Sequence, residues 1–188
     1  MTRCFAVLTV LLMMGMVLTR VFIMRRKGVE AMHFGKIDKT DYFIPPFALF
    51  YFYLIFAAAF GWPAPSTGEF FDSDAVGWIG VALCLAGLTL LAWSLVLFGQ
   101  SFRVGIDTER PDKLITTGLF AFSRNPIYVA FALILLGQFL IFSNWLLLAY
   151  LVAGCWLFHR QVLREEEFLG RHYGRDFEEY CKRVRRYV

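Results

Sequence analysis

Two short polar stretches stand at the two ends of a long apolar run, and both carry residue types that bind charged ligands. SRNPIYV covers residues 123–129 and REEEF covers residues 164–168, whereas residues 129–158 contain no charged side chain. Arginine, asparagine and tyrosine can hold anionic or polar groups, and glutamate can hold a cation or accept a proton. Together the two stretches suit a ligand that carries charges of both signs.

The elements that must position these stretches are apolar. Of the 188 residues, 59% are hydrophobic and 18% are charged, against about 45–50% apolar and about 25% charged in typical globular proteins. Such a chain requires an apolar environment around it. A membrane-spanning helix needs about 20 mostly apolar residues. Five uncharged runs meet or approach this length, at residues 4–19, 43–60, 75–98, 126–142 and 145–158.

The expected fold class is all-α, an integral membrane bundle of about five transmembrane helices. The last two runs are short and are separated only by Ser143 and Asn144, so they predict a tight C-terminal helical hairpin. Residues 1–97 would supply three spans, and residues 98–188 would form the core that carries both polar stretches. An apolar stripe at helical spacing predicts an interfacial tail helix on the membrane surface, broken near Gly174. The stripe consists of Val162, Leu169, Tyr173, Phe177, Tyr180 and Val184.

The basic residues indicate how the spans are oriented. In a five-span arrangement, 18 of the 19 lysines and arginines fall on one side of the membrane, and Arg3 is the exception. Because cytoplasmic loops carry this excess, we expect the N-terminus outside and the C-terminus in the cytoplasm. The first run is expected to be a span, since no A-x-A cleavage site follows it. The charge distribution predicts contact with membrane lipids and no nucleic-acid partner.

The four cysteines do not indicate a metal site or a disulfide framework. Cys4, Cys84, Cys155 and Cys181 form no CxxC pair and no metal-ligand cluster. Three of them lie in apolar runs, so we interpret the cysteines as packing residues.

Each polar residue near the hairpin also has a purely structural interpretation. Asn125 can cap the helix that starts at Pro126, and Tyr128 can be an interfacial aromatic residue. Arg124 can anchor the cytoplasmic side, and the carboxylates at 165–167 can form a solvated helix face. These separate interpretations do not explain why all of these residues occur together. Three adjacent carboxylates at an anionic membrane surface are unfavourable unless they serve a bound cation or pair with arginines.

The segments LITTGLFAFSRNPIYVA and REEEFLGRHYGRDFEEYCKRV, with the apolar hairpin between them, resemble the isoprenylcysteine carboxyl methyltransferase and phospholipid methyltransferase superfamily. That pattern is a Gly-Leu/Pro/Ile-aromatic turn, Arg-His-Pro-x-Tyr, a hairpin, a Glu-Glu pair and an aromatic-Gly-x-x-aromatic-x-x-Tyr tail. The resemblance covers about residues 98–184. It implies an integral membrane methyltransferase that binds S-adenosyl-L-methionine without a Rossmann domain, and the chain has no G-x-G-x-x-G fingerprint.

The resemblance also implies roles for individual residues. Glu165 and Glu166 would pair with the cofactor's amino group, either Arg124 or Arg164 with its carboxylate, and two tyrosines with its adenine or ribose. The cofactor-binding positions implied in this way are Gly118, Leu119, Arg124, Asn125, Tyr128, Arg164, Glu165, Glu166 and Tyr180. Because Asn125 stands where the family has histidine and cannot titrate, it is expected to bind and not to transfer protons.

The methyl acceptor is expected to be a lipophilic small molecule or a lipidated molecule, since an enzyme in the bilayer can admit it between helices. An acceptor carboxylate is already ionised at pH 7, so it needs positioning and desolvation more than a base. Arg103 is the catalytic candidate for holding it, although Arg103 can equally contact lipid phosphate. An amine, thiol or phenol acceptor would need a base, and Glu166 or Glu167 could serve.

Two features leave alternatives open. Gln161 occupies the place where the family tends to have an arginine, and Arg160 and Arg164 bracket it, so either arginine could contact the ligand. Two other function classes compete with a methyltransferase. A membrane reductase that uses a nicotinamide cofactor usually has more than the five spans expected here, and a non-catalytic membrane scaffold would bind no nucleotide specifically.

Overall fold

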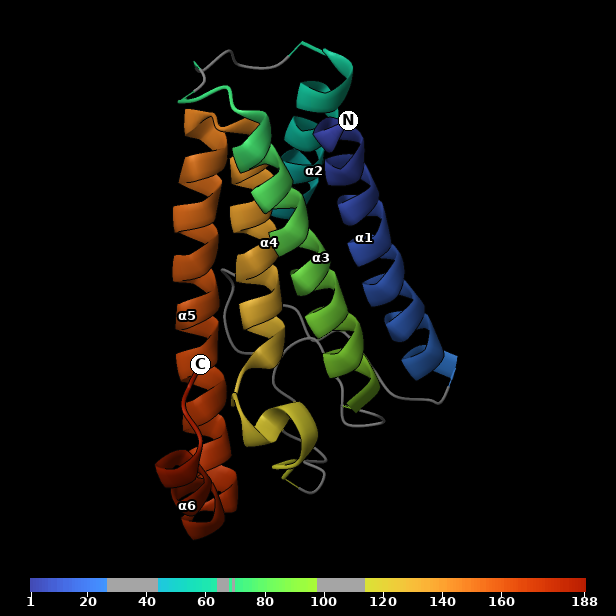
Figure 1. Ribbon diagram of the computed structural model, residues 1–188. Coiled ribbons are helices and arrows are strands. Elements are labelled where there is room, and N and C mark those ends of the chain that lie inside the picture. The colour runs from blue at the N-terminus through green and yellow to red at the C-terminus, as the bar shows by residue number, and fades with distance from the viewer. Residues whose placement is uncertain (27–43, 64–67, 69, 98–113) are drawn as a thin grey trace.

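The regular elements of the protein are helices throughout the part that a computed structural model describes, which comprises residues 1–26, 44–63, 68, 70–97 and 114–188. Figure 1 shows the longer helices side by side, with a short 3-10 helix and the last α-helix beyond one end of the bundle. In chain order the elements are α1 (Thr2–Arg26), α2 (Ile44–Phe60), α3 (Asp74–Leu97), η3 (Gly118–Ala121), α4 (Pro126–Phe142), α5 (Trp145–Tyr173) and α6 (Arg175–Arg183).

The helices have the length and composition of a multi-pass membrane protein. Among the described residues, α1, α3 and α5 are long and apolar enough to cross a membrane, and α2 and α4 are shorter apolar helices. The predicted all-α membrane bundle is therefore confirmed. Each of the five predicted runs falls on one of these helices. Residue 43, which begins the second run, and residue 98, which ends the third, lie outside the described residues.

The hairpin turn between α4 and α5 satisfies its own backbone. Ser143 adopts a left-handed conformation with φ 41° and donates its backbone N–H to the Phe139 carbonyl group. Asn144 then caps α5, because its side-chain oxygen accepts a hydrogen bond of 2.9 Å from the backbone N–H of Leu147. The predicted two-residue turn is confirmed, and it brings the start of α4 beside the second half of α5.

Close packing against α3 fixes the position of α4. A Cβ atom added to Gly137 would lie 2.5 Å from the carbonyl oxygen of Gly80, and one added to Gly87 would lie 2.9 Å from that of Ala130. Membrane helices use small residues in this way to bring their backbones together. Gln138 on α4 is fully buried and donates a hydrogen bond of 2.9 Å to the Ala6 carbonyl oxygen, which ties α1 to the same pair.

The tail folds back onto the protein beyond the bundle. Gly174, with φ 51° and ψ −120°, separates α5 from α6, so the predicted break is confirmed. The position of the tail helix on the membrane surface stays a prediction, but Phe177, Tyr180 and Val184 of its apolar stripe face the protein. These residues are buried against Phe120 of η3. Helical spacing identifies an apolar face, but here a neighbouring segment of the same chain covers it.

The cysteines do not all pack in the interior. All four are free thiols. Cys84 is buried on α3, which agrees with a packing role, whereas Cys4 and Cys155 are exposed on the outside of the bundle. The packing interpretation is therefore wrong for these two residues. In an apolar environment a thiol behaves as a small hydrophobic group, so it does not need to be buried inside the protein.

Candidate functional site

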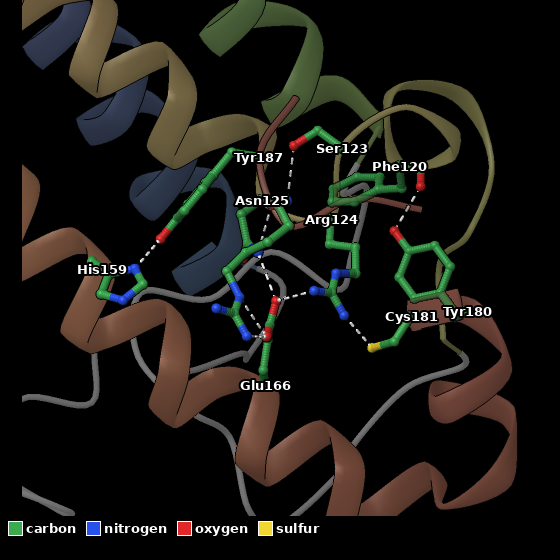
Figure 2. A network of polar contacts seen from close by, with 10 residues as sticks. Phe120, Ser123, Arg124, Asn125, His159, Glu166, Tyr180, Cys181 and Tyr187 are labelled. Atoms are coloured by element: carbon green, nitrogen blue, oxygen red, sulfur yellow. Dashed lines mark hydrogen bonds and ion pairs between the residues drawn. The ribbon is translucent and has the colours of Figure 1, made fainter. Parts of the chain in front are cut away.

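The two polar stretches meet where α4 begins and α5 leaves the apolar bundle. Figure 2 shows Arg124 and Asn125 pointing toward Glu166, which comes from the second half of α5. The Asn125 amide nitrogen lies 3.2 Å from Glu166 Oε1, and Arg124 Nη2 lies 3.4 Å from the same oxygen. The hairpin thus brings together residues that are 41 positions apart in the sequence.

Glu166 is the centre of this cluster. Its side chain is only 11% exposed, and its second carboxylate oxygen, Oε2, lies 2.9 Å from both Nε and Nη2 of Arg186. Both carboxylate oxygens are therefore bound by guanidinium groups. Burying a carboxylate is costly unless it is paired and hydrogen-bonded. Arg124 and Arg186 meet this requirement from two different parts of the chain.

Asn125 contributes its side chain to the cluster and not to the helix. It occupies the N-cap position of α4, but its side chain caps no backbone N–H. The amide nitrogen instead donates to Glu166 Oε1 and, at 3.1 Å, to the carbonyl oxygen of Arg186. The capping interpretation of Asn125 is therefore wrong. The residue is 8% exposed, and its environment favours an amide donor over a helix cap.

Arg124 is a buried guanidinium with unused donor capacity. Its Nη1 contacts the Cys181 sulfur, and its backbone N–H donates a hydrogen bond of 3.0 Å to the Arg185 carbonyl oxygen. Its Nε atom is buried and has no hydrogen-bond partner among the described residues. Arginine carries five N–H donors and favours carboxylate or phosphate partners. The position therefore fits an additional anionic group.

A second pair lies beside the first. The Tyr128 hydroxyl donates a hydrogen bond of 2.6 Å to Glu165 Oε1, and Gln161 Nε2 donates one of 3.1 Å to the same oxygen. Burial raises the pKa of the Glu165 carboxyl group, while the two hydrogen bonds act in the opposite direction. Because both donors are neutral, Glu165 has no cation bound to it in these contacts.

The remaining predicted residues are distributed around the cluster. Tyr180 is 4% exposed and its hydroxyl donates a hydrogen bond of 2.6 Å to the Phe120 carbonyl oxygen, so this group already serves the fold. Burial raises the pKa of Tyr180 to about 12. Gly118, with φ +65°, lies against Leu97, where a Cβ atom would come within 2.9 Å of a Leu97 methyl group.

Other predicted positions lie before the cluster or outside it. Leu119 shapes the turn before Arg124, because its carbonyl oxygen accepts the backbone N–H groups of Phe122 and Ser123. Arg164 is half-buried on α5 next to Glu165. Glu167 is exposed and pairs with Arg171, so it does not join the cluster. Arg103 lies outside the described residues.

Sequence reasoning missed the contribution of the C-terminus. The sequence indicates only that Arg186 is a basic residue of the tail, whereas in the structure it binds Glu166 directly. The Tyr187 hydroxyl also lies 2.7 Å from Nδ1 of His159. One feature of the sequence pointed to this segment: the apolar stripe ends at Val184, which indicates that the last helix ends near there. Only the reversal at Gly174 brings these residues back to the hairpin.

The fold and the cluster define a helical membrane protein whose polar site lies at the open end of the C-terminal hairpin, opposite the Ser143–Asn144 turn. We call this end the hairpin mouth. Residues 76–176, which are more than half of the chain, match the family model described as phospholipid methyltransferase. The chain belongs to this family, which confirms the resemblance noted in its sequence. The matched residues include Arg124, Asn125, Glu165 and Glu166.

Similar proteins carry related names. The probable protein-S-isoprenylcysteine O-methyltransferase of Oryza sativa subsp. indica is 30% identical over 112 residues, which are 58% of this chain and 59% of that protein. The protein-S-isoprenylcysteine O-methyltransferase of Schizosaccharomyces pombe is 31% identical over 117 residues, which are 61% and 48% of the two chains. The matches thus span less than two thirds of these relatives.

A solved structure shows a similar fold. The eukaryotic intramembrane Ras methyltransferase ICMT, an isoprenylcysteine carboxyl methyltransferase, superposes with a TM-score of 0.59 at 20% identity. The similarity covers 88% of this chain and 58% of that chain. It therefore extends beyond the matched family region.

Proposed function

We propose that the protein is an integral membrane methyltransferase that transfers a methyl group from S-adenosyl-L-methionine to a lipophilic acceptor. The acceptor would resemble an isoprenylcysteine carboxylate or a phospholipid headgroup. The main support is the convergence of Arg124, Asn125 and Glu166 at the hairpin mouth, inside the region that matches the phospholipid methyltransferase family. Membership of this family favours a methyltransferase over a nicotinamide-dependent reductase or a scaffold.

The residues present fit the amino-acid part of the proposed cofactor. S-adenosyl-L-methionine would supply a methyl group on a cationic sulfonium, and it carries one carboxylate and one amino group. Arg124, whose buried Nε has no partner among the described residues, would hold the carboxylate. Glu165 would hold the amino group, because its present partners, Tyr128 and Gln161, are neutral donors. Glu166, engaged by two arginines, would mainly hold those arginines in place.

The acceptor would be positioned more than activated. A carboxylate acceptor needs no general base, so the chain must exclude water and align the reacting groups. Glu166 is a weak candidate for a base, since protonating it would break its contacts with both arginines. We retain Arg103 as the proposed contact for an acceptor carboxylate and Arg164 as a further arginine of this site.

The site is proposed to face the cytoplasm, with the N-terminus on the opposite side. In Figure 1 the C-terminal ends of α1, α3 and α5 lie at the end of the bundle that carries η3 and α6. The last turn of α1 contains Arg25 and Arg26. The basic residues of the tail lie at the same end, which is the distribution expected for a cytoplasmic face.

Direct binding followed by an acceptor screen tests the proposal. The purified protein in nanodiscs is expected to bind radiolabelled S-adenosyl-L-methionine and to methylate an S-farnesylated cysteine with a free carboxylate. The methyl ester of the same compound is the control, because its acceptor oxygen is blocked. Transfer to phosphatidylethanolamine in its place would assign the phospholipid-like acceptor. Absence of specific cofactor binding would contradict the proposed function.

A further inference from the structure

The chain after α6 returns to the candidate site as an extended segment, residues 184–188, which we call the C-terminal segment. Val184 ends α6 in an extended conformation and is buried in the cluster around Phe120. Figure 1 shows the C-terminus lying alongside α5, well away from the end of α6. The segment lies beyond residue 176, where the match to the family model ends.

Two consecutive carbonyl groups of the segment bind the start of α4. The Arg185 carbonyl oxygen accepts the backbone N–H of Arg124 at 3.0 Å. The Arg186 carbonyl oxygen accepts the side-chain amide of Asn125 at 3.1 Å. Since both acceptors are backbone atoms, these contacts depend on the path of the segment and not on its side chains.

The Arg186 side chain also holds the segment in place. Its Nε and Nη2 both lie 2.9 Å from Glu166 Oε2, whereas the Arg124 contact to Oε1 is longer, at 3.4 Å. Arg186 is therefore the better-placed partner of the buried carboxylate. Its side chain is 38% exposed, so solvent screens the pair, and geometry is its main contribution. A planar guanidinium can make this two-donor contact, which a lysine ammonium cannot reproduce.

We infer that Arg186 is a positioning residue for the methyltransferase site. It fastens the C-terminal segment across the start of α4 and holds the Glu166 carboxylate where that group orients Arg124 and Asn125. The inference rests on the proposed function, because Arg124 is a proposed cofactor contact and Asn125 lies beside it. A merely structural role would stabilise the tail and leave cofactor binding unchanged.

The test compares Arg186→Gln with Arg185→Gln, which removes the same charge from the neighbouring, exposed side chain. Affinity for S-adenosyl-L-methionine is measured in nanodiscs, together with amide hydrogen exchange of the peptide that contains Arg124. Misplacing Arg124 would weaken its proposed charge-assisted contact with the cofactor carboxylate, so Arg186→Gln is expected to lower affinity about tenfold and to speed exchange at Arg124. Arg185→Gln should change neither quantity, and Arg186→Lys should restore part of the affinity.

A double-mutant cycle shows whether Arg186 acts through Glu166. If it does, Arg186→Gln should weaken binding little further in a Glu166→Gln background, because contacting residues are not additive. Additive losses, or faster exchange with unchanged affinity, would overturn the positioning role. If the wild-type protein binds no S-adenosyl-L-methionine, the proposed function fails, and the exchange rates alone decide whether Arg186 fastens the segment. Unchanged exchange in Arg186→Gln would then overturn the inference as well.

Discussion

The Tyr128 hydroxyl donates a hydrogen bond of 2.6 Å to Glu165 Oε1 and so connects the first turn of α4 to α5, 37 residues later. Gln161 donates a second hydrogen bond to the same oxygen, so both of these donors to Glu165 are neutral side chains. A carboxylate that accepts hydrogen bonds from neutral donors is suited to receive a cation. The contrast with Glu166, which two arginines engage, separates the roles of two adjacent glutamates.

Glu165→Gln is therefore expected to weaken binding of S-adenosyl-L-methionine at least about tenfold, since one charge-assisted hydrogen bond contributes about 1.5–3 kcal/mol. Glutamine preserves the size of the side chain and an oxygen for Tyr128, so the melting temperature should change little. Calorimetry in detergent measures the affinity. Glu167→Gln is the matched control, because Glu167 is exposed and pairs with Arg171 outside the cluster. Equal affinity in both variants would remove the Glu165 carboxylate from the site.

The contact between α3 and α4 predicts a sharp difference between two glycines. Gly137→Ala would place a Cβ atom 2.5 Å from the Gly80 carbonyl oxygen, and neither backbone can move without repacking the bundle. Overpacking of this kind typically costs about 1–3 kcal/mol. Gly15→Ala is the control, because a Cβ atom there would meet no atom of another helix within 4 Å. Thermal unfolding in detergent should show a clear loss for Gly137→Ala alone, and equal melting temperatures would contradict the close approach.

The features that sequence could predict are those that depend on neighbouring residues. The apolar runs and the Ser143–Asn144 turn are local, so hydropathy and turn chemistry identified the five helices and the hairpin. The position of Asn125 beside Pro126 is locally ideal for a helix cap, yet its amide donates to Glu166 and to the Arg186 carbonyl oxygen. Arg186 could not be recognised, because its contact depends on a chain reversal at Gly174 and on the path that follows α6.

The apolar stripe shows the same limit. Helical spacing correctly grouped Phe177, Tyr180 and Val184 on one face. It could not show that η3 covers this face, because η3 lies some 60 residues earlier in the chain, as the Tyr180–Phe120 hydrogen bond illustrates. A membrane surface and a neighbouring segment both satisfy an apolar face, and local sequence does not distinguish them.

The orientation of the bundle can be tested with single cysteines. Asp72 lies in the connection before α3 and lines the same cavity as Met1, so it belongs to the N-terminal end of the bundle. In a background without the exposed native cysteines, Asp72→Cys should react with a membrane-impermeant maleimide added outside intact cells. Arg175→Cys, on the exposed start of α6, should react only after the membrane is opened. The reverse pattern would show that the charge-based orientation is wrong.

Asn125 offers the most direct test of what the hairpin mouth does. If Asn125 only capped α4, Asn125→Asp would be tolerated, because aspartate caps a helix about as well as asparagine and favours its positive end. The structure leads to a different expectation. Aspartate loses the amide donor to Glu166 and to the Arg186 carbonyl oxygen, and it brings a second carboxylate to within about one hydrogen-bond length of the first.

We therefore expect Asn125→Asp to abolish methyl transfer, with only a small fall in melting temperature because the cluster lies at the end of the bundle. Asn125→His should retain activity, since an imidazole N–H can donate to Glu166 and histidine is the residue that the family pattern places here. Turnover and thermal unfolding of the two variants are measured side by side with the wild type. Full activity of Asn125→Asp would mean that SRNPIYV is a helix start without a role in binding.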